Sequence, residues 1–153
     1  MSTTYAGQRR SERTFIQEAV AVSGARPTDN VTIAGKRNVD VVIDLMRRGF
    51  SNVLCQSAEN GPHVSPPADL LIAPDLKSEA DLINVLTRLG RDLRPRGVVV
   101  TTCAWAFTAV DERRLRRLFM AHGFVAVERI AGRGDAQTVW CAHKGAASLR
   151  RAA

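Results

Sequence analysis

Short apolar runs alternate with amphipathic segments along most of this chain, and this alternation constrains its fold more than any other feature. Helical spacing is expected at residues 11–23, 38–48, 78–93 and 111–122, and apolar strands are expected at 31–35, 52–56, 69–73 and 98–103. Two further strands, at 124–130 and 138–143, are separated only by a polar turn and should form an antiparallel hairpin. Such alternation is typical of a parallel sheet covered by helices on both faces. The sequence therefore predicts an α/β fold with about six strands, mostly parallel, closed by the hairpin.

The segment after Asn38 has the clearest helical periodicity. Its apolar residues Val39, Val42, Ile43 and Met46 recur at i, i+3, i+4 and i+7, which places them on one side of a helix. This spacing predicts that these four side chains face the core. Asn38 is expected to cap the start of the helix.

Length and hydropathy indicate a single domain. The 153 residues suffice for one hydrophobic core, which we expect to span residues 11–145. Residues 1–10 are expected to form a disordered leader, and residues 146–153 a short tail. The sequence has no apolar run of the roughly 18 residues that a membrane span needs, and its polar N-terminus does not resemble a secretory signal. We therefore expect a cytoplasmic protein with no membrane partner.

The chain is strongly basic, with a formal net charge of +7. Two groups of four arginines each fall on or beside a predicted helix: Arg113, Arg114, Arg116 and Arg117, and Arg88, Arg91, Arg94 and Arg96. Such patches can bind nucleic acid or another polyanion. Solvated helix faces commonly carry the same pattern, so both interpretations stay open.

The three cysteines, Cys55, Cys103 and Cys141, each lie within an apolar run. Their spacing matches no zinc-binding pattern, and their odd number does not suit a disulfide framework. We expect buried, inert thiols, with a reactive thiol as the alternative, and we expect no metal site.

Three stretches of the sequence resemble the class I S-adenosylmethionine-dependent methyltransferases. DLLIAPDL (69–76) stands where that family has its fourth strand and an acidic loop, and LGRDLRPRGVVVTT (89–102) matches its helix, turn and fifth strand. MAHGFVAVERI (120–130) resembles the start of its reversed final hairpin. The resemblance covers residues 11–145 and implies a Rossmann-like sheet with the strand order 2-1-4-5-7-6 in the family's labels.

The loop after the first strand departs from the family's cofactor signature. The resemblance implies an acid followed by three spaced glycines, which allow the backbone to approach the methionine moiety closely. Here Gly35 is retained, whereas Ile33 replaces the acid and Arg37 and Val39 replace the later glycines. Arg37 and Lys36 precede a helix N-terminus and so would suit an anion better than a sulfonium cation.

The second strand and the loop after it also differ from the family. Gln56 stands where the family has an acid that binds the ribose hydroxyls, and Glu59 nearby is a candidate substitute. Only the loop at 57–67 separates the second strand from DLLIA, which is too short for the family's next helix and third strand. The third strand is therefore expected to be missing, and S-adenosylmethionine binding is disfavoured.

Four further residues are candidates because ligands bind beyond the carboxyl ends of parallel strands. Asp75 follows the DLLIA strand and is the candidate catalytic residue, although an acid in a turn before a helix is the commoner explanation. His63 in the loop could act as a base, and Trp105 and Phe107 after the strand at 98–103 could contact a substrate or partner. Each also has an ordinary structural explanation.

These observations lead to three hypotheses. The first is a catalytically degenerate methyltransferase-like domain that acts by binding a ligand, a partner or a second copy of itself, because a missing strand exposes a sheet edge that dimerisation can cover. The second is a small active methyltransferase with an unusual cofactor site. The third is a nucleotide-binding or nucleic-acid-binding protein.

Overall fold

The computed structural model describes residues 15–35, 38–57, 66–103, 105, 108–130 and 138–146. The predicted leader at 1–10 lies outside the described residues, as does nearly all of the predicted tail at 146–153.

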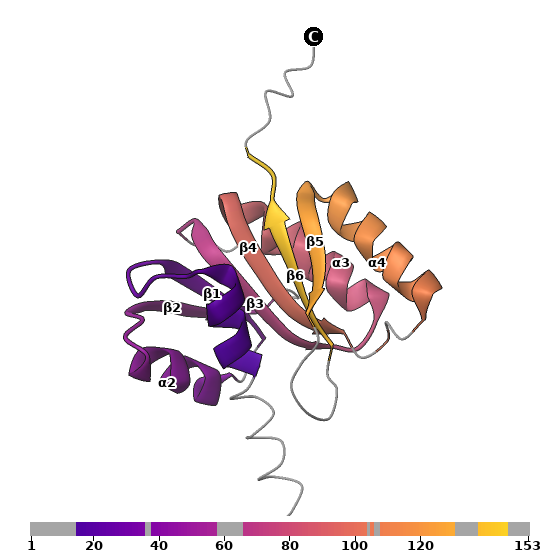
Figure 1. The fold of residues 1–153 in the computed structure, drawn as a ribbon. Helices are drawn as coiled ribbons and strands as arrows, with labels where there is room; N and C mark the ends of the chain where they lie inside the picture. The colour runs from indigo at the N-terminus through magenta and orange to yellow at the C-terminus, as the bar shows by residue number, and fades with distance from the viewer. Residues whose placement is uncertain are drawn as a thin grey trace, which may run out of the picture.

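The described residues form one sheet with six strands (Figure 1). The strands are β1 (Asn30–Ala34), β2 (Asn52–Gln56), β3 (Ala68–Leu76), β4 (Leu93–Cys103), β5 (Phe124–Ile130) and β6 (Val139–Lys144). Their order is β2-β1-β3-β4-β6-β5, and the first four are mutually parallel. β6 runs antiparallel to both β4 and β5. This arrangement confirms the predicted six-stranded, mostly parallel sheet with an antiparallel end.

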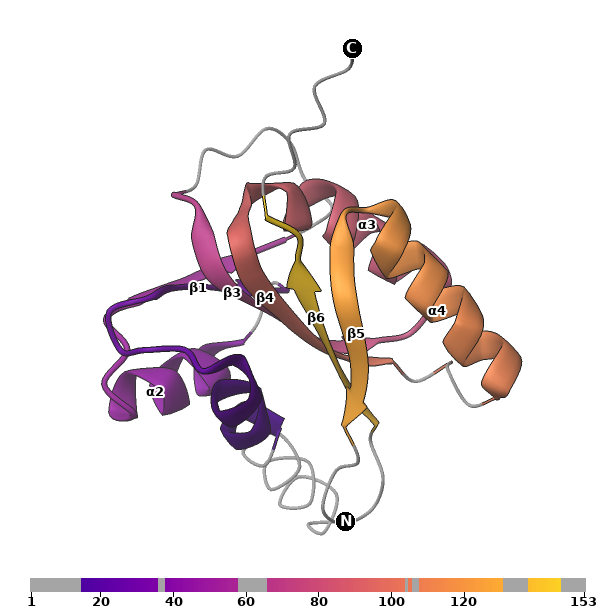
Figure 2. The same cartoon turned by 45° about the horizontal axis from the view of Figure 1, so that its top comes forward.

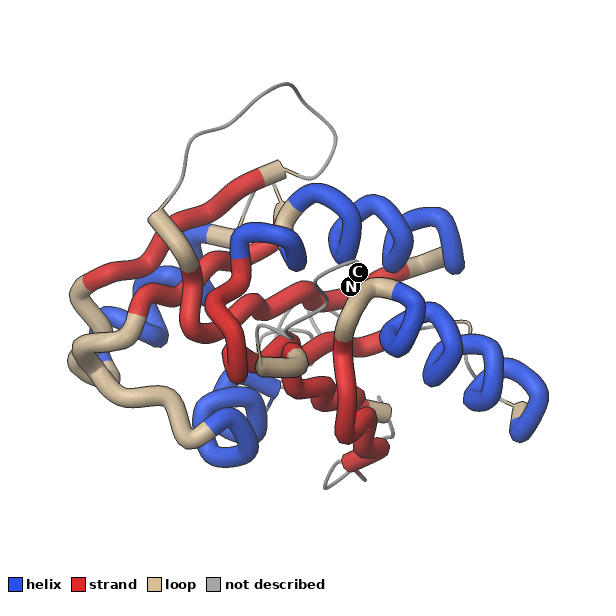
Figure 3. The backbone as a smooth tube through the Cα atoms, turned by 90° about the horizontal axis from the view of Figure 1, so that it is seen from above, coloured by secondary structure: helices blue, strands red, loops and turns tan. Residues whose placement is uncertain are grey.

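Helices cover both faces of this sheet (Figures 2 and 3). They are the helical residues 15–23 and α2 (Val39–Arg47) on one face, and α3 (Glu79–Arg88) and α4 (Ala109–Ala121) on the other. Each face has its own apolar cluster, with Phe15, Leu45 and Ile72 in one and Leu82, Phe119 and Trp140 in the other. None of the helices in the described ranges is long and apolar enough to span a bilayer.

The helix α2 is turned differently from the sequence prediction. Its buried residues are Val41 and Leu45, and Val42 is half-buried. Val39 and Met46, which were expected in the core, are 67% and 59% exposed. The prediction for this face was wrong because apolar residues cover well over half of the helix circumference, so the periodicity did not single out the side that packs.

The ends of two other helices also differ from the sequence prediction. The predicted helix at 78–93 ends at Arg88, and a short 3-10 helix (Gly90–Asp92) follows. β4 begins at Leu93, before the start of the predicted strand at 98–103. α4 begins before the predicted helix at 111–122, and its N-cap is Thr108. The Thr108 hydroxyl accepts from the Asp111 N–H at 3.1 Å, and the Asp111 carboxylate accepts from the Thr108 N–H at 3.2 Å, which is a capping box.

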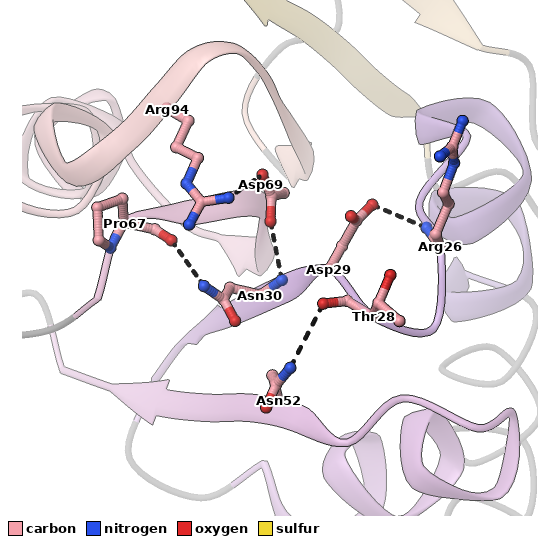
Figure 4. A network of polar contacts seen from close by, with 8 residues as sticks. All are labelled: Arg26, Thr28, Asp29, Asn30, Asn52, Pro67, Asp69 and Arg94. Atoms are coloured by element: carbon pink, nitrogen blue, oxygen red, sulfur yellow. Dashed lines mark hydrogen bonds and ion pairs between the residues drawn. The ribbon is translucent and has the colours of Figure 1, made fainter.

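A polar network joins the amino-terminal ends of the parallel strands (Figure 4). The Asp69 carboxylate accepts from the Asn30 N–H at 2.9 Å and from the Arg94 guanidinium at 3.2 Å, linking β1, β3 and β4. The Asn52 amide donates to the Thr28 carbonyl at 3.4 Å and so attaches β2. These polar side chains therefore have structural partners at the amino-terminal ends of the strands, away from the carboxyl ends where ligands are expected.

Lys144 fixes the end of β6. Its ammonium group donates to the carbonyls of Gly90, Arg91 and Leu93 at 3.0, 3.1 and 2.6 Å. Burial lowers the pKa of Lys144, while the Asp92 carboxylate opposes this shift. The bonds tie the last strand to the turn that leads into β4.

Candidate functional site

The carboxyl ends of β1 to β4 lie together along one side of the domain, as expected for parallel strands. Four predicted site residues stand at or just beyond these ends: Gly35, Gln56, Asp75 and Trp105. The other predicted site residues lie outside the described residues: Lys36, Arg37, Glu59, His63 and Phe107. The described part of the candidate site therefore comprises one residue at or just beyond the carboxyl end of each of the four parallel strands.

Gly35 opens a space at the end of β1 that Asn38 fills. Its φ of +134° is a conformation that side chains disfavour, and its N–H donates to the Gln56 carbonyl at 2.8 Å. The Asn38 amide donates to the Ala34 carbonyl at 3.0 Å, and a Cβ added to Gly35 would overlap the Asn38 amide nitrogen. Asn38 was predicted as a helix cap, yet its side chain makes no capping bond and turns back over β1. The space left open by the missing side chain of Gly35 is thus occupied by the side chain of Asn38.

Two buried polar atoms near the carboxyl ends of the strands have no hydrogen-bond partner within the described structure. They are Gln56 Oε1 at the end of β2 and Trp105 Nε1 beyond the end of β4. An unpaired buried polar group costs about 1–3 kcal/mol, so most such groups in proteins are paired. Gln56 was predicted to contact a ribose, and its unpaired oxygen could accept a hydrogen bond but not supply the negative charge of the family's acid.

Asp75 lies inside β3 and not in the loop expected after this strand. Its φ of +56° is in the left-handed region, which Asp tolerates better than most residues. The Asp75 N–H donates to the Thr102 hydroxyl at 2.8 Å, and the Thr101 hydroxyl donates to the Ala73 carbonyl at 2.6 Å. These two threonines hold the end of β3 against β4 and leave the Asp75 side chain exposed. Neither threonine contact could be anticipated from sequence, because both depend on strand register.

Two of the four arginines on α4 contact other elements of the domain, while the Arg113 guanidinium donates to the Ala109 carbonyl within the helix at 3.4 Å. Arg114 forms an ion pair with Glu79 of α3 at 2.9 Å. The Arg116 guanidinium donates to the Val127 carbonyl and lies over the ring of Trp140, 5.4 Å from its centroid. These two residues therefore help to hold the helical layer and the final hairpin together.

The cysteine environments agree with inert thiols for two of the three residues. Cys103 and Cys141 are buried, and burial raises the pKa of Cys103 to about 12 and that of Cys141 to about 11. Cys55 is half-buried, and burial raises its pKa as well. The described residues contain no group of three or more His, Cys, Asp and Glu side chains that could hold a metal ion.

We expect iodoacetamide to modify Cys55 first in the native protein at pH 8. Cys103 and Cys141 should stay unmodified until the protein unfolds, because only the thiolate reacts and both side chains are enclosed. Peptide mass spectrometry over a labelling time course measures the three sites separately. Urea-unfolded protein, in which all three should react at similar rates, is the control, and rapid native labelling of Cys103 would contradict this prediction.

Comparison with known proteins identifies the fold of the chain through solved structures. No family model matches the chain, and no curated protein matches it by sequence. Solved structures do match. The ribosomal protein L11 methylase of Lactobacillus delbrueckii subsp. bulgaricus aligns with a TM-score of 0.64 at 11% identity, over 86% of this chain and 77% of that one.

Two further structures give the same result. A SAM-dependent O-methyltransferase from Thermotoga maritima aligns with a TM-score of 0.61 at 11% identity, over 88% of this chain and 67% of that one. A release factor-specific protein-(glutamine-N5) methyltransferase from Alicyclobacillus acidocaldarius aligns with a TM-score of 0.56 at 16% identity, over 86% of this chain and 90% of that one. The chain therefore has a class I methyltransferase-like fold, as the sequence resemblance implied.

Proposed function

We propose that this methyltransferase-like domain acts by binding a ligand or partner and has lost methyl transfer. The observation that carries the proposal is the side chain of Asn38, which occupies the space over Gly35 where the family's backbone approaches its cofactor. The methionine moiety of S-adenosylmethionine and the Asn38 side chain would therefore occupy the same space, and both cannot be bound there at once. No methyl-transfer step is therefore assigned to these residues.

The second strand gives independent support for this proposal. Gln56 replaces a carboxylate, so the ribose hydroxyls would lose a charged acceptor, and hydrogen bonds to charged groups are about twice as strong as neutral ones. The loss of both contacts together would weaken cofactor binding more than either change alone.

Isothermal titration calorimetry with S-adenosylmethionine and S-adenosylhomocysteine tests the proposal. We expect no measurable heat of binding at micromolar to millimolar cofactor, with an active class I methyltransferase as the positive control for the assay. Circular dichroism of the same sample confirms that the domain is folded. A micromolar dissociation constant would refute the proposal, and methyl transfer abolished by Asp75→Asn would establish an active enzyme instead.

One observation favours the active enzyme as the second candidate. Asp75 is an exposed carboxylate held in a left-handed conformation that costs about 1–3 kcal/mol, and residues in such conformations cluster at functional sites. Polyanion binding has less support on α4, because Arg114 and Arg116 already have partners. Cytoplasmic location stays a prediction from the sequence.

A further inference from the structure

The free edge of β2 differs from the other edge of the sheet. Within the described residues β2 pairs only with β1, in continuous register over all five residues, and its sequence NVLCQ carries no charge. The opposite edge, β5, has a register shift next to Ala126, whose φ is +52°, and carries exposed Glu128 and Arg129. Bulges and charges are the usual protection of sheet edges against pairing. β5 has this protection, and β2 does not.

An apolar stripe on α2 borders this unprotected edge. We define the α2 stripe as Val39, Ile43 and Met46, which are 67%, 40% and 59% exposed. The half-buried Val42 connects the stripe to the apolar cluster that also contains Val53 of β2. A β–α–β unit is almost always a right-handed crossover. With Val41 and Leu45 buried against the sheet, this handedness places Val39 and Met46 on the flank of α2 nearer the free edge of β2, and Ile43 on the outer side of the helix.

We propose that β2 and the α2 stripe form a two-fold interface with a second copy of this chain. A two-fold axis perpendicular to the sheet would pair β2 with its symmetry mate in antiparallel fashion. The two α2 helices would then run antiparallel on the same face, about two strand spacings or 10 Å apart. Packed helices have axes 8–10 Å apart, so a single two-fold rotation would both pair the free edge of β2 and bury the α2 stripe.

The backbone of β2 fixes the register of this pairing. The Gln56 carbonyl faces β1, where it accepts from the Gly35 N–H, so by alternation Leu54 also faces β1. The N–H and C=O groups of Val53 and Cys55 therefore face the free edge. Antiparallel pairing of Val53 with the second copy's Cys55 makes four hydrogen bonds and places the two Leu54 residues opposite each other on the axis. Leu54, now 39% exposed, would be covered by its own copy.

The charges on α2 also favour a second copy of the chain. Asp40 lies in the first turn of the helix, and Arg47 lies in the last turn. An antiparallel partner brings the basic end of one helix beside the acidic end of the other and opposes the two helix dipoles favourably. The surface is thus complementary to itself in shape, hydrogen bonding and charge.

This inference names a partner for the binding role proposed above and rests on that role for its biological meaning. Its test involves no S-adenosylmethionine, so either proposal can fail alone. Analytical ultracentrifugation of the full chain should give twice the 16.7 kDa mass of a single chain at micromolar concentration. Met46→Glu should give the single-chain mass, whereas the matched control Met120→Glu, on the exposed face of α4, should remain dimeric. A monomeric native protein, or a dimeric Met46→Glu variant, would overturn the proposal.

A cross-linking experiment tests the register. In a Cys55→Ser background, Leu54→Cys should form an intermolecular disulfide under mild oxidation, because facing non-hydrogen-bonded residues have the Cα separation that a disulfide needs. The control is Val125→Cys in the same background, since Val125 is exposed on the opposite edge strand. A covalent dimer on non-reducing gels is expected for Leu54→Cys alone. Equal cross-linking of both variants would overturn the proposed register.

Discussion

Replacing Phe119 with alanine is expected to lower the free energy of unfolding by about 3–5 kcal/mol. Phe119 on α4 is fully buried, and its ring meets that of Phe124 on β5 edge-to-face, with centroids 5.8 Å apart and planes at 76°. The substitution leaves a cavity and removes an aromatic pair worth about 0.5–1.5 kcal/mol beyond its buried area. Because small domains have only about 5–15 kcal/mol of stability, this loss is a large share of the total.

Urea denaturation followed by circular dichroism measures this change. Met120→Ala is the matched control, because Met120 follows Phe119 on the same helix but is 65% exposed. The control should change stability by no more than about 0.5 kcal/mol. A loss below 1 kcal/mol for Phe119→Ala would contradict the packing of α4 against β5 described above.

The second large effect is expected for Leu45→Ala in α2. Leu45 has no exposed surface, so its truncation should cost about 2–5 kcal/mol. Met46→Ala should leave the stability of the single chain nearly unchanged, although the sequence periodicity places Met46 in the core. The pair of variants therefore distinguishes directly between the two orientations of the helix.

Protein concentration separates packing within one chain from packing between copies. The loss caused by Leu45→Ala should be the same at all concentrations, whereas any effect of Met46→Ala should grow with concentration, since association stabilises by mass action. In samples dilute enough to contain single chains only, a Met46→Ala variant destabilised more than Leu45→Ala would show that the helix is turned the other way.

The strand order was predictable from sequence, whereas the orientation of α2 was not. Continuous apolar runs and the final hairpin specify which segments are strands, and the family resemblance supplies their order, which the structure confirms. Six of the nine residues in α2 are apolar, so a helical period fits more than one face. Which face is buried depends on how the helix lies over β1 and β2, and no local pattern contains that information.

The candidate site was only partly predictable for a related reason. Gly35, Gln56 and Asp75 were found because they lie at or next to the carboxyl ends of strands, and parallel strands end on the same side of a sheet. The return of Asn38 over Gly35 and the support of Asp75 by Thr102 depend on tertiary geometry. Asn38 has a strong local preference to cap a helix, but its side-chain amide donates a hydrogen bond to the Ala34 carbonyl instead.

The position of β6 has a consequence for how the chain acquires its structure. β6 comes after β5 in the sequence but lies between β4 and β5 in the sheet. During synthesis, which adds about 5–20 residues per second, β5 is made before the strand with which it pairs. A nascent chain that ends before Val139 must leave one edge of β4 unpaired. Stalled or shortened chains should therefore be prone to aggregation, and the domain completes its sheet only when its last strand is available.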